Sequence, residues 1–96
     1  MNIQIQSVKF DADKKLVAFI EEKVSKLDRY AEGIISTDVT LKLDKDRDHG
    51  NKVAVLKLDL SGDVLVAERQ CKSFEEAIDL SIDALRKQLS KYKAKD

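Results

Sequence analysis

Hydrophobic and polar residues alternate along two stretches of the chain, as they do in strands with one buried face. Ile3 and Ile5 alternate with glutamines near the N-terminus, and a longer alternation covers residues 34–44. Because successive side chains of a strand point to opposite faces, one set in the longer stretch should be buried. We expect that set to be Ile35, Thr37, Val39, Leu41 and Leu43.

Apolar residues at helical spacing predict a first helix from Lys14 to about Arg29. Either Asp11 or Asp13 can cap its N-terminus, because a carboxylate accepts a hydrogen bond from a free backbone amide of the first turn. The residues of its buried stripe are spaced four, four and three apart, and they are Leu16, Ile20, Val24 and Leu27.

A second helix is predicted near the C-terminus. It should begin at a capping box in which Ser73 accepts a hydrogen bond from the Glu76 amide. Its buried stripe follows the same helical period and comprises Ile78, Ile82, Leu85, Leu89 and Tyr92.

Residues 52–72 contain two further strands around a turn at residues 61–63, where Gly62 is a good hairpin signal. The element order is therefore β-α-β-β-β-α, which is typical of the α+β class. Consecutive hairpins favour an antiparallel meander. We expect one domain of 96 residues, with a four-stranded, mainly antiparallel sheet and both helices on one face.

The chain shows no targeting or membrane-spanning pattern. Its N-terminal residues alternate instead of forming a signal sequence, and the longest apolar run covers only residues 16–20. The single cysteine, Cys71, excludes an intrachain disulfide and suits a reducing compartment. We therefore expect a cytoplasmic protein without a membrane partner, and Cys71 as a small buried side chain.

Asp44, Asp46 and Asp48 alternate like the start of a calcium-binding loop, but the match then fails. Such a loop needs glycine at its sixth position and glutamate at its twelfth, where this chain has His49 and Val55. One histidine and one cysteine cannot supply a zinc site, and no glycine-rich phosphate loop is present. We predict no metal, no cofactor and no enzymatic activity.

The chain carries 18 basic and 18 acidic residues, yet its C-terminal stretch is basic. The acids of the second helix lie in its first half, and we expect its second half to lack the mixed pairs at i, i+4 that would stabilise it most. The basic residues of this stretch are Arg86, Lys87, Lys91, Lys93 and Lys95. They can be interpreted as complementing the helix dipole or as a docking surface for a polyanion.

The first helix carries a comparable stripe beside its buried face, formed by Phe19, Lys23, Lys26 and Tyr30. Aromatic rings that flank lysines can support their aliphatic stems while the ammonium groups contact phosphate. Alternatively, the two aromatic residues are the margin of the core, and the lysines extend past them to water. The spacing does not decide between these interpretations.

Three segments resemble the bacterial ribosome hibernation-promoting factors, also called ribosome-associated inhibitors or sigma-54 modulation proteins. The segments are LVAFIEEKVSKLDRY, TLKLDK and AIDLSIDALRKQLSKYK, and the resemblance extends over essentially the whole chain. It implies a fold similar to double-stranded-RNA-binding domains. It also implies a stress-induced factor that binds 16S rRNA of the small ribosomal subunit, in the channel for mRNA and tRNA, and stabilises inactive ribosomes.

The same resemblance implies which residues face the rRNA. In the two helices the matching positions are Lys23, Lys26, Arg86, Lys87 and Lys91, with Arg29 and Lys93 as weaker matches. Lys42 and Lys45 match strand positions that are often basic in the family.

The length of the chain resembles that of the short members, which lack a C-terminal dimerisation domain. The resemblance therefore implies a single ribosome-binding domain that competes with mRNA and tRNA and is monomeric when free. Two other functions stay open: a protein-binding regulator of the sigma-factor type, and a general binder of double-stranded RNA.

The charged turn around His49 leads to a first testable prediction. Micromolar Ca²⁺ or Zn²⁺ should leave the melting temperature unchanged, because the loop lacks the ligands that complete either site. Thermal unfolding followed by circular dichroism would measure this. A stabilisation that saturates at one ion per chain would contradict the prediction.

Overall fold

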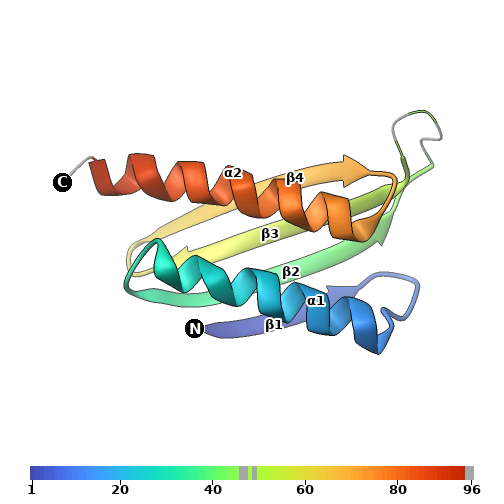
Figure 1. The fold of residues 1–96 in the computed structure, drawn as a ribbon, viewed down its shortest axis with the longest axis horizontal. Coiled ribbons are helices and arrows are strands. Elements are labelled where there is room, and N and C mark those ends of the chain that lie inside the picture. Colours follow the sequence, from blue (N-terminus) through green and yellow to red (C-terminus); the bar gives the residue numbers. More distant parts are fainter. Residues whose placement is uncertain (46–47, 49, 95–96) are drawn as a thin grey trace.

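The computed structural model describes residues 1–45, 48 and 50–94, and its elements follow the order predicted for the chain (Figure 1). In chain order they are β1 (Asn2–Ser7), α1 (Lys14–Ser25), a short 3-10 helix η1 (Lys26–Arg29), β2 (Ile34–Leu43), β3 (Lys52–Leu60), β4 (Asp63–Cys71) and α2 (Phe74–Ala94). The β-α-β-β-β-α order and the α+β class are confirmed.

The four strands form one sheet in the order β1-β2-β3-β4. The pairs β2–β3 and β3–β4 are antiparallel, as the short connections between them require, whereas β1 is parallel to β2. A parallel pair needs a crossover, and α1 provides it. The sheet is mainly antiparallel, as expected, but the expectation of a simple meander is wrong for β1.

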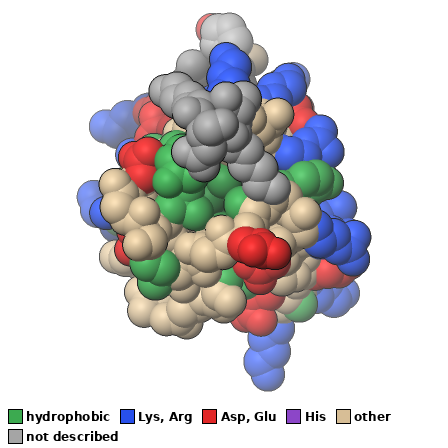
Figure 2. All heavy atoms as spheres, turned by 90° about the vertical axis from the view of Figure 1, so that its left-hand side faces the viewer, with side chains coloured by type: hydrophobic (Ala, Val, Ile, Leu, Met, Phe, Trp, Pro, Cys, Tyr) green, Lys and Arg blue, Asp and Glu red, His purple; other side chains and the backbone are tan. Residues whose placement is uncertain are grey.

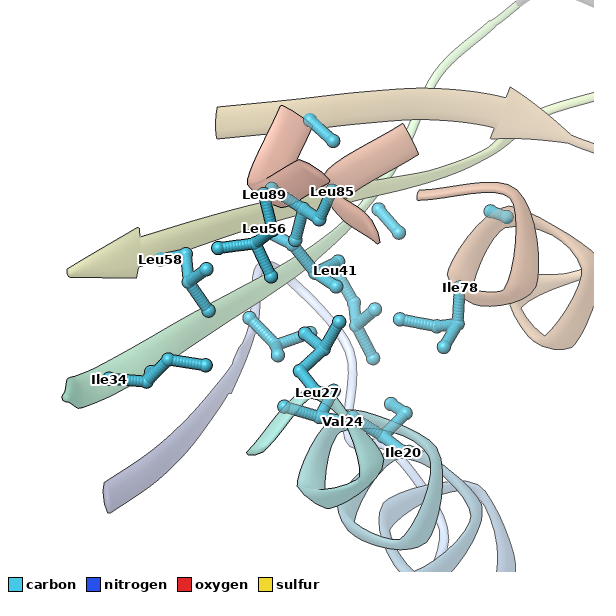
Figure 3. Close-up of a cluster of buried hydrophobic side chains, with 14 of the residues drawn as sticks. Ile20, Val24, Leu27, Ile34, Leu41, Leu56, Leu58, Ile78, Leu85 and Leu89 are labelled. Carbon is cyan, nitrogen blue, oxygen red and sulfur yellow. The ribbon is translucent and has the colours of Figure 1, made fainter. Parts of the chain in front are cut away.

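Both helices lie on the same face of the sheet, and the core is between them and the strands (Figures 1 and 3). The helices contribute Ile20, Val24, Leu27, Ile78, Leu85 and Leu89, each fully buried. Leu41, Leu56 and Leu58 meet them from the central strands. Leu16 and Ile82 were also expected in the core. They are only partly buried and pack against its margin.

The predicted alternation of β2 holds in its middle and fails at both ends. Thr37, Val39 and Leu41 are buried, but Ile35 is 55% exposed and Ile34 takes the buried position instead. The pairing register with β3 shifts between residues 34 and 36, as it does at a β-bulge. One extra residue reverses the inside–outside phase of every residue before it. At the other end Leu43, the last residue of the strand, is 49% exposed.

The predicted helix caps and hairpin turn are present. Asp13, not Asp11, caps α1, because its Oδ1 accepts from the Leu16 amide at 2.8 Å. Ser73 Oγ accepts from the Glu76 amide at 3.2 Å and caps α2. Gly62 turns the β3–β4 hairpin with φ of 84°, a value that side chains disfavour.

Cys71 ends β4 and is 6% exposed. Burial raises the pKa of its thiol, and the charge of Glu76 raises it further. A buried thiol with a raised pKa is a poor nucleophile, which agrees with the structural interpretation of this residue. The Gly50 backbone lies directly against the Cys71 carbonyl, where a Cβ would collide with it. Only glycine fits at this close approach, and a hydrogen bond of 2.9 Å from Gln70 Nε2 to the Gly50 carbonyl holds the β2–β3 connection against the end of β4.

At the edge of the sheet, β4 is partly covered by a side chain of α2. Gln88 Nε2 donates a hydrogen bond of 3.0 Å to the Val66 carbonyl. The side chains of Val64 and Val66 point to the face without helices, where they are 44% and 50% exposed. The helices therefore cover one face and part of this edge, and the other face stays open.

Replacing Leu85 tests the helical phase. Leu85→Ala should lower the free energy of unfolding by about 2–5 kcal/mol, because it leaves a cavity in a fully buried site. The matched control is Leu80→Ala on the same helix, where the side chain is 45% exposed and the loss should stay below about 0.5 kcal/mol. Urea unfolding of both variants measures the difference. Equal losses would mean that the assigned core face is wrong.

Candidate nucleic-acid interface

Packing of the helices brings the end of η1 against the second half of α2. A shallow hollow of about 460 Å³ lies between them. It is lined by Arg29, Tyr30, Arg86, Lys87 and Ser90. Three of these five residues are cationic and none is acidic, so the hollow suits an anion.

Arg86 is held over the ring of Tyr30, with its guanidinium carbon 5.6 Å from the ring centroid. This distance allows a cation–π contact between the two segments. The Tyr30 hydroxyl, and then the charge of Asp83, raise the pKa of the Arg86 guanidinium above its usual value. Like any guanidinium, Arg86 is a permanent positive charge, and Tyr30, which is 39% exposed, helps to fix its place.

On α1, the predicted stripe has both of the properties that the sequence left open. Phe19 is partly buried and packs against the core, so it does belong to the core margin. Lys23 Nζ lies 5.5 Å from the centroid of that ring, so the ring also supports the lysine. Lys26 lies at the junction of α1 and η1, one turn before Tyr30.

Acidic residues accompany most of the helix cations. Asp83 pairs with Arg86 at 2.5 Å and with Lys87 at 3.4 Å. Lys23 pairs with Asp79 across the two helices at 3.9 Å, and Lys26 pairs with Glu22 at 3.8 Å. The expectation that the second half of α2 lacks pairs at i, i+4 is wrong, because Asp83 and Lys87 form one.

The two cations beside Asp83 favour the charged form of that carboxyl. Lys87 first, and Arg86 after it, lower its pKa below the usual range. Asp83 is therefore ionised at neutral pH. Ion pairs at such exposed positions contribute little to folding stability, so they explain only in part why Arg86 and Lys87 are basic.

Arg29 and Lys91 differ from the other helix cations. Within residues 1–45, 48 and 50–94, neither forms an ion pair with a carboxylate. Figure 2 views the end of the molecule at which α2 terminates and shows Lys and Arg side chains gathered along its right-hand rim. Unpaired cations are the ones most readily available to a phosphate.

The remaining predicted residues do not join this group. Lys42 lies on the open face of the sheet and pairs with Glu68 at 3.8 Å. Lys45 follows β2 at the opposite end from the C-terminus of α2 (Figure 1). The backbone of Lys93 continues α2, but its side chain is outside the described part of the chain. An rRNA contact from any of the three stays a prediction.

Metal sites and membrane spans are absent from the part of the chain that the structure describes. Its residues contain no group of three or more His, Cys, Asp or Glu side chains that could hold a metal ion. Asp46 and His49 of the charged turn lie outside that description. None of the helices in the described ranges combines the length and apolarity of a membrane span.

Two solved structures share this arrangement of sheet and helices. A ribosomal subunit interface protein from Coxiella burnetii superposes with a TM-score of 0.87 at 24% identity, covering 98% of this chain and 99% of that one. The N-terminal domain of Protein Y from Thermus thermophilus gives 0.82 at 26% identity, covering 96% and 99%. The chain therefore shares the fold of these two proteins.

The family follows from the sequence comparisons. The family model described as Sigma 54 modulation protein / S30EA ribosomal protein matches residues 3–96, and the chain belongs to this family. A ribosome hibernation promoting factor from Azotobacter vinelandii is 33% identical over 95 residues, covering 99% of this chain and 85% of that protein. The resemblance noted in the sequence is confirmed.

A longer relative is similar over a part of its length. The ribosome hibernation promotion factor of Deinococcus radiodurans is 31% identical over 94 residues, which cover 96% of this chain and 49% of that protein. The chain thus spans about half the length of this relative and matches one segment of it.

Proposed function

We propose that this protein is a ribosome hibernation factor that binds 16S rRNA of the small subunit through its two helices. The observation that carries the proposal is the hollow in which Arg29, Arg86 and Lys87 converge beside Tyr30. These residues come from two segments far apart in the sequence, and only the fold brings them together. The names of its relatives support the ribosome as the partner.

The proposed mechanism is steric and does not involve catalysis. Cations on both helices would contact rRNA phosphates, and the bound domain would occupy the channel for mRNA and tRNA and so compete with both. Each phosphate contact releases condensed counterions, so affinity should fall steeply with salt. A net charge of zero limits binding to nucleic acid in general, because the acidic parts of the surface repel it.

The proposal extends to the form in which the protein acts. Residues 1–96 would act as one ribosome-binding domain, free in the cytoplasm as a monomer and without a cofactor. Binding would hold the small subunit in an inactive state during stress.

A protein-binding regulator is the second candidate. The observation that favours it is the open face of the sheet, where Val64 and Val66 are exposed on β4. Cosedimentation with purified small subunits across a salt series distinguishes the two candidates. A contact with protein alone would give a shallow salt dependence and no competition by tRNA.

Reversing two charges on α2 tests the proposed interface. Lys87→Glu combined with Lys91→Glu should abolish cosedimentation with small subunits, while it lowers the free energy of unfolding by only about 1–2 kcal/mol. If the cations only complement the helix dipole, the folded variant should bind almost normally. Replacing Lys91 alone should flatten the plot of log affinity against log salt by roughly 0.7–0.9, because it removes one phosphate contact.

The matched control is Lys14→Glu combined with Lys15→Glu. It makes the same change in net charge at two exposed residues of the first turn of α1, far from the hollow. This variant should bind small subunits much as the original protein does. Equal loss of binding in both double variants would indicate an effect of total charge, and an unchanged salt slope in the folded α2 variant would refute the interface.

A further inference from the structure

We propose that Asp83 is a specificity-determining residue, which weakens binding to RNA in general and so favours the one RNA surface that offers several contacts at once. The inference rests on the proposed function and concerns the same hollow. It assigns a role in binding to an acidic side chain, whereas the charged residues of the proposed interface are all basic.

The geometry places Asp83 in direct competition with a phosphate. Its Oδ1 contacts Arg86 Nη2 at 2.5 Å, and its Oδ2 is 3.4 Å from Lys87 Nζ. Each carboxylate oxygen is therefore committed to a different cation, and both cations line the hollow. A phosphate that approaches either cation must displace the carboxylate or share the cation with it.

The competing carboxylate is charged at neutral pH. The lowered pKa of Asp83 keeps it ionised, so it repels an incoming phosphate at close range. Arg86 does not need Asp83 to keep its place, because the ring of Tyr30 already supports it. Removing the carboxylate should therefore free the cation without displacing it.

A second acid repeats this arrangement. Asp79 lies one helical turn before Asp83 and pairs with Lys23 of α1. Among the described residues, Arg29 and Lys91 are the helix cations of the proposed interface without such a partner. A flexible RNA strand that contacts one or two cations gains too little binding free energy to displace the carboxylates of these acids. A rigid surface that also contacts Arg29, Tyr30 and Lys91 gains enough binding free energy to displace the carboxylates.

Specificity is a difference between two affinities, and an element that penalises the wrong partner can create it. Here the penalty differs between partners: a rigid complementary surface can place a hydroxyl or amino donor against the displaced carboxylate and so recover part of the cost, whereas a flexible strand that offers only phosphates recovers none. Asp83 thus lowers the affinity for arbitrary RNA more than the affinity for the matching surface.

The test compares Asp83→Asn with Glu75→Gln. Both variants lose one negative charge from α2, but Glu75 forms no ion pair within the described residues. Dissociation constants are measured for purified small subunits and for poly(U), each over a series of salt concentrations. Circular dichroism and urea unfolding confirm that both variants fold.

Asp83→Asn should tighten binding to poly(U) by about three- to fivefold, the effect of one exposed charge pair. The salt slope for poly(U) should steepen by about 0.7 for each additional phosphate bound. Binding to small subunits should tighten by less than about twofold, so the ratio of the two affinities falls. Glu75→Gln should change both affinities by less than about 1.5-fold.

Three results would overturn the inference. Weaker binding of Asp83→Asn to both RNAs would mean that the carboxylate orients Arg86. An effect equal to that of Glu75→Gln would mean that only net charge matters, and equal tightening on both RNAs would mean that Asp83 sets affinity without specificity. If the original protein does not bind small subunits at all, the proposed function fails. The poly(U) measurements still report on Asp83 in that case.

Discussion

The apolar stripes of α1, η1 and α2 can leave water together only if both helices pack on the same face of the sheet, and this shared core positions everything else. Ile20, Val24 and Leu27 meet Ile78, Leu85 and Leu89 above the central strands (Figure 3). The packing fixes the helices side by side and brings the end of η1 against α2. The same packing sets the distance between the two segments at which the Tyr30 ring meets the Arg86 guanidinium.

This packing also explains how a chain without net charge can present a basic surface. The cations are concentrated where the helices meet, and several of them are paired with acids on neighbouring turns. The pairs make the surface less attractive to polyanions than a count of its lysines and arginines suggests. In the proposed interface, affinity for RNA would then depend on shape as well as charge, since only a matching surface could contact the paired and the unpaired cations together.

Much of the fold could be predicted from the sequence, because periodicity reports which side of each element is buried. It identified the stripe through Ile20 and Leu27 and the caps of both helices. Periodicity does not report the direction of a neighbouring strand, so the parallel pairing of β1 with β2 was missed. A single extra residue reverses the inside–outside phase, so the exposure of Ile35 was also missed. For the candidate site, helical spacing indicated that Lys23, Arg86 and Lys87 lie outside the buried stripes of their helices. The meeting of Arg29 with α2 depends on tertiary packing, although the pair of Asp83 with Lys87 could have been recognised from its spacing.

The hydrogen bond from Gln88 to the Val66 carbonyl has a consequence for how the protein behaves at high concentration. An edge strand offers backbone groups to which a strand from another molecule can add, and sheets extend or aggregate in this way. An amide side chain that occupies one of these acceptors interrupts the ladder at the middle of β4. A neighbouring molecule would have to break that bond before it could join the sheet. A single glutamine on α2 therefore opposes uncontrolled self-assembly in a protein whose open face carries exposed valines.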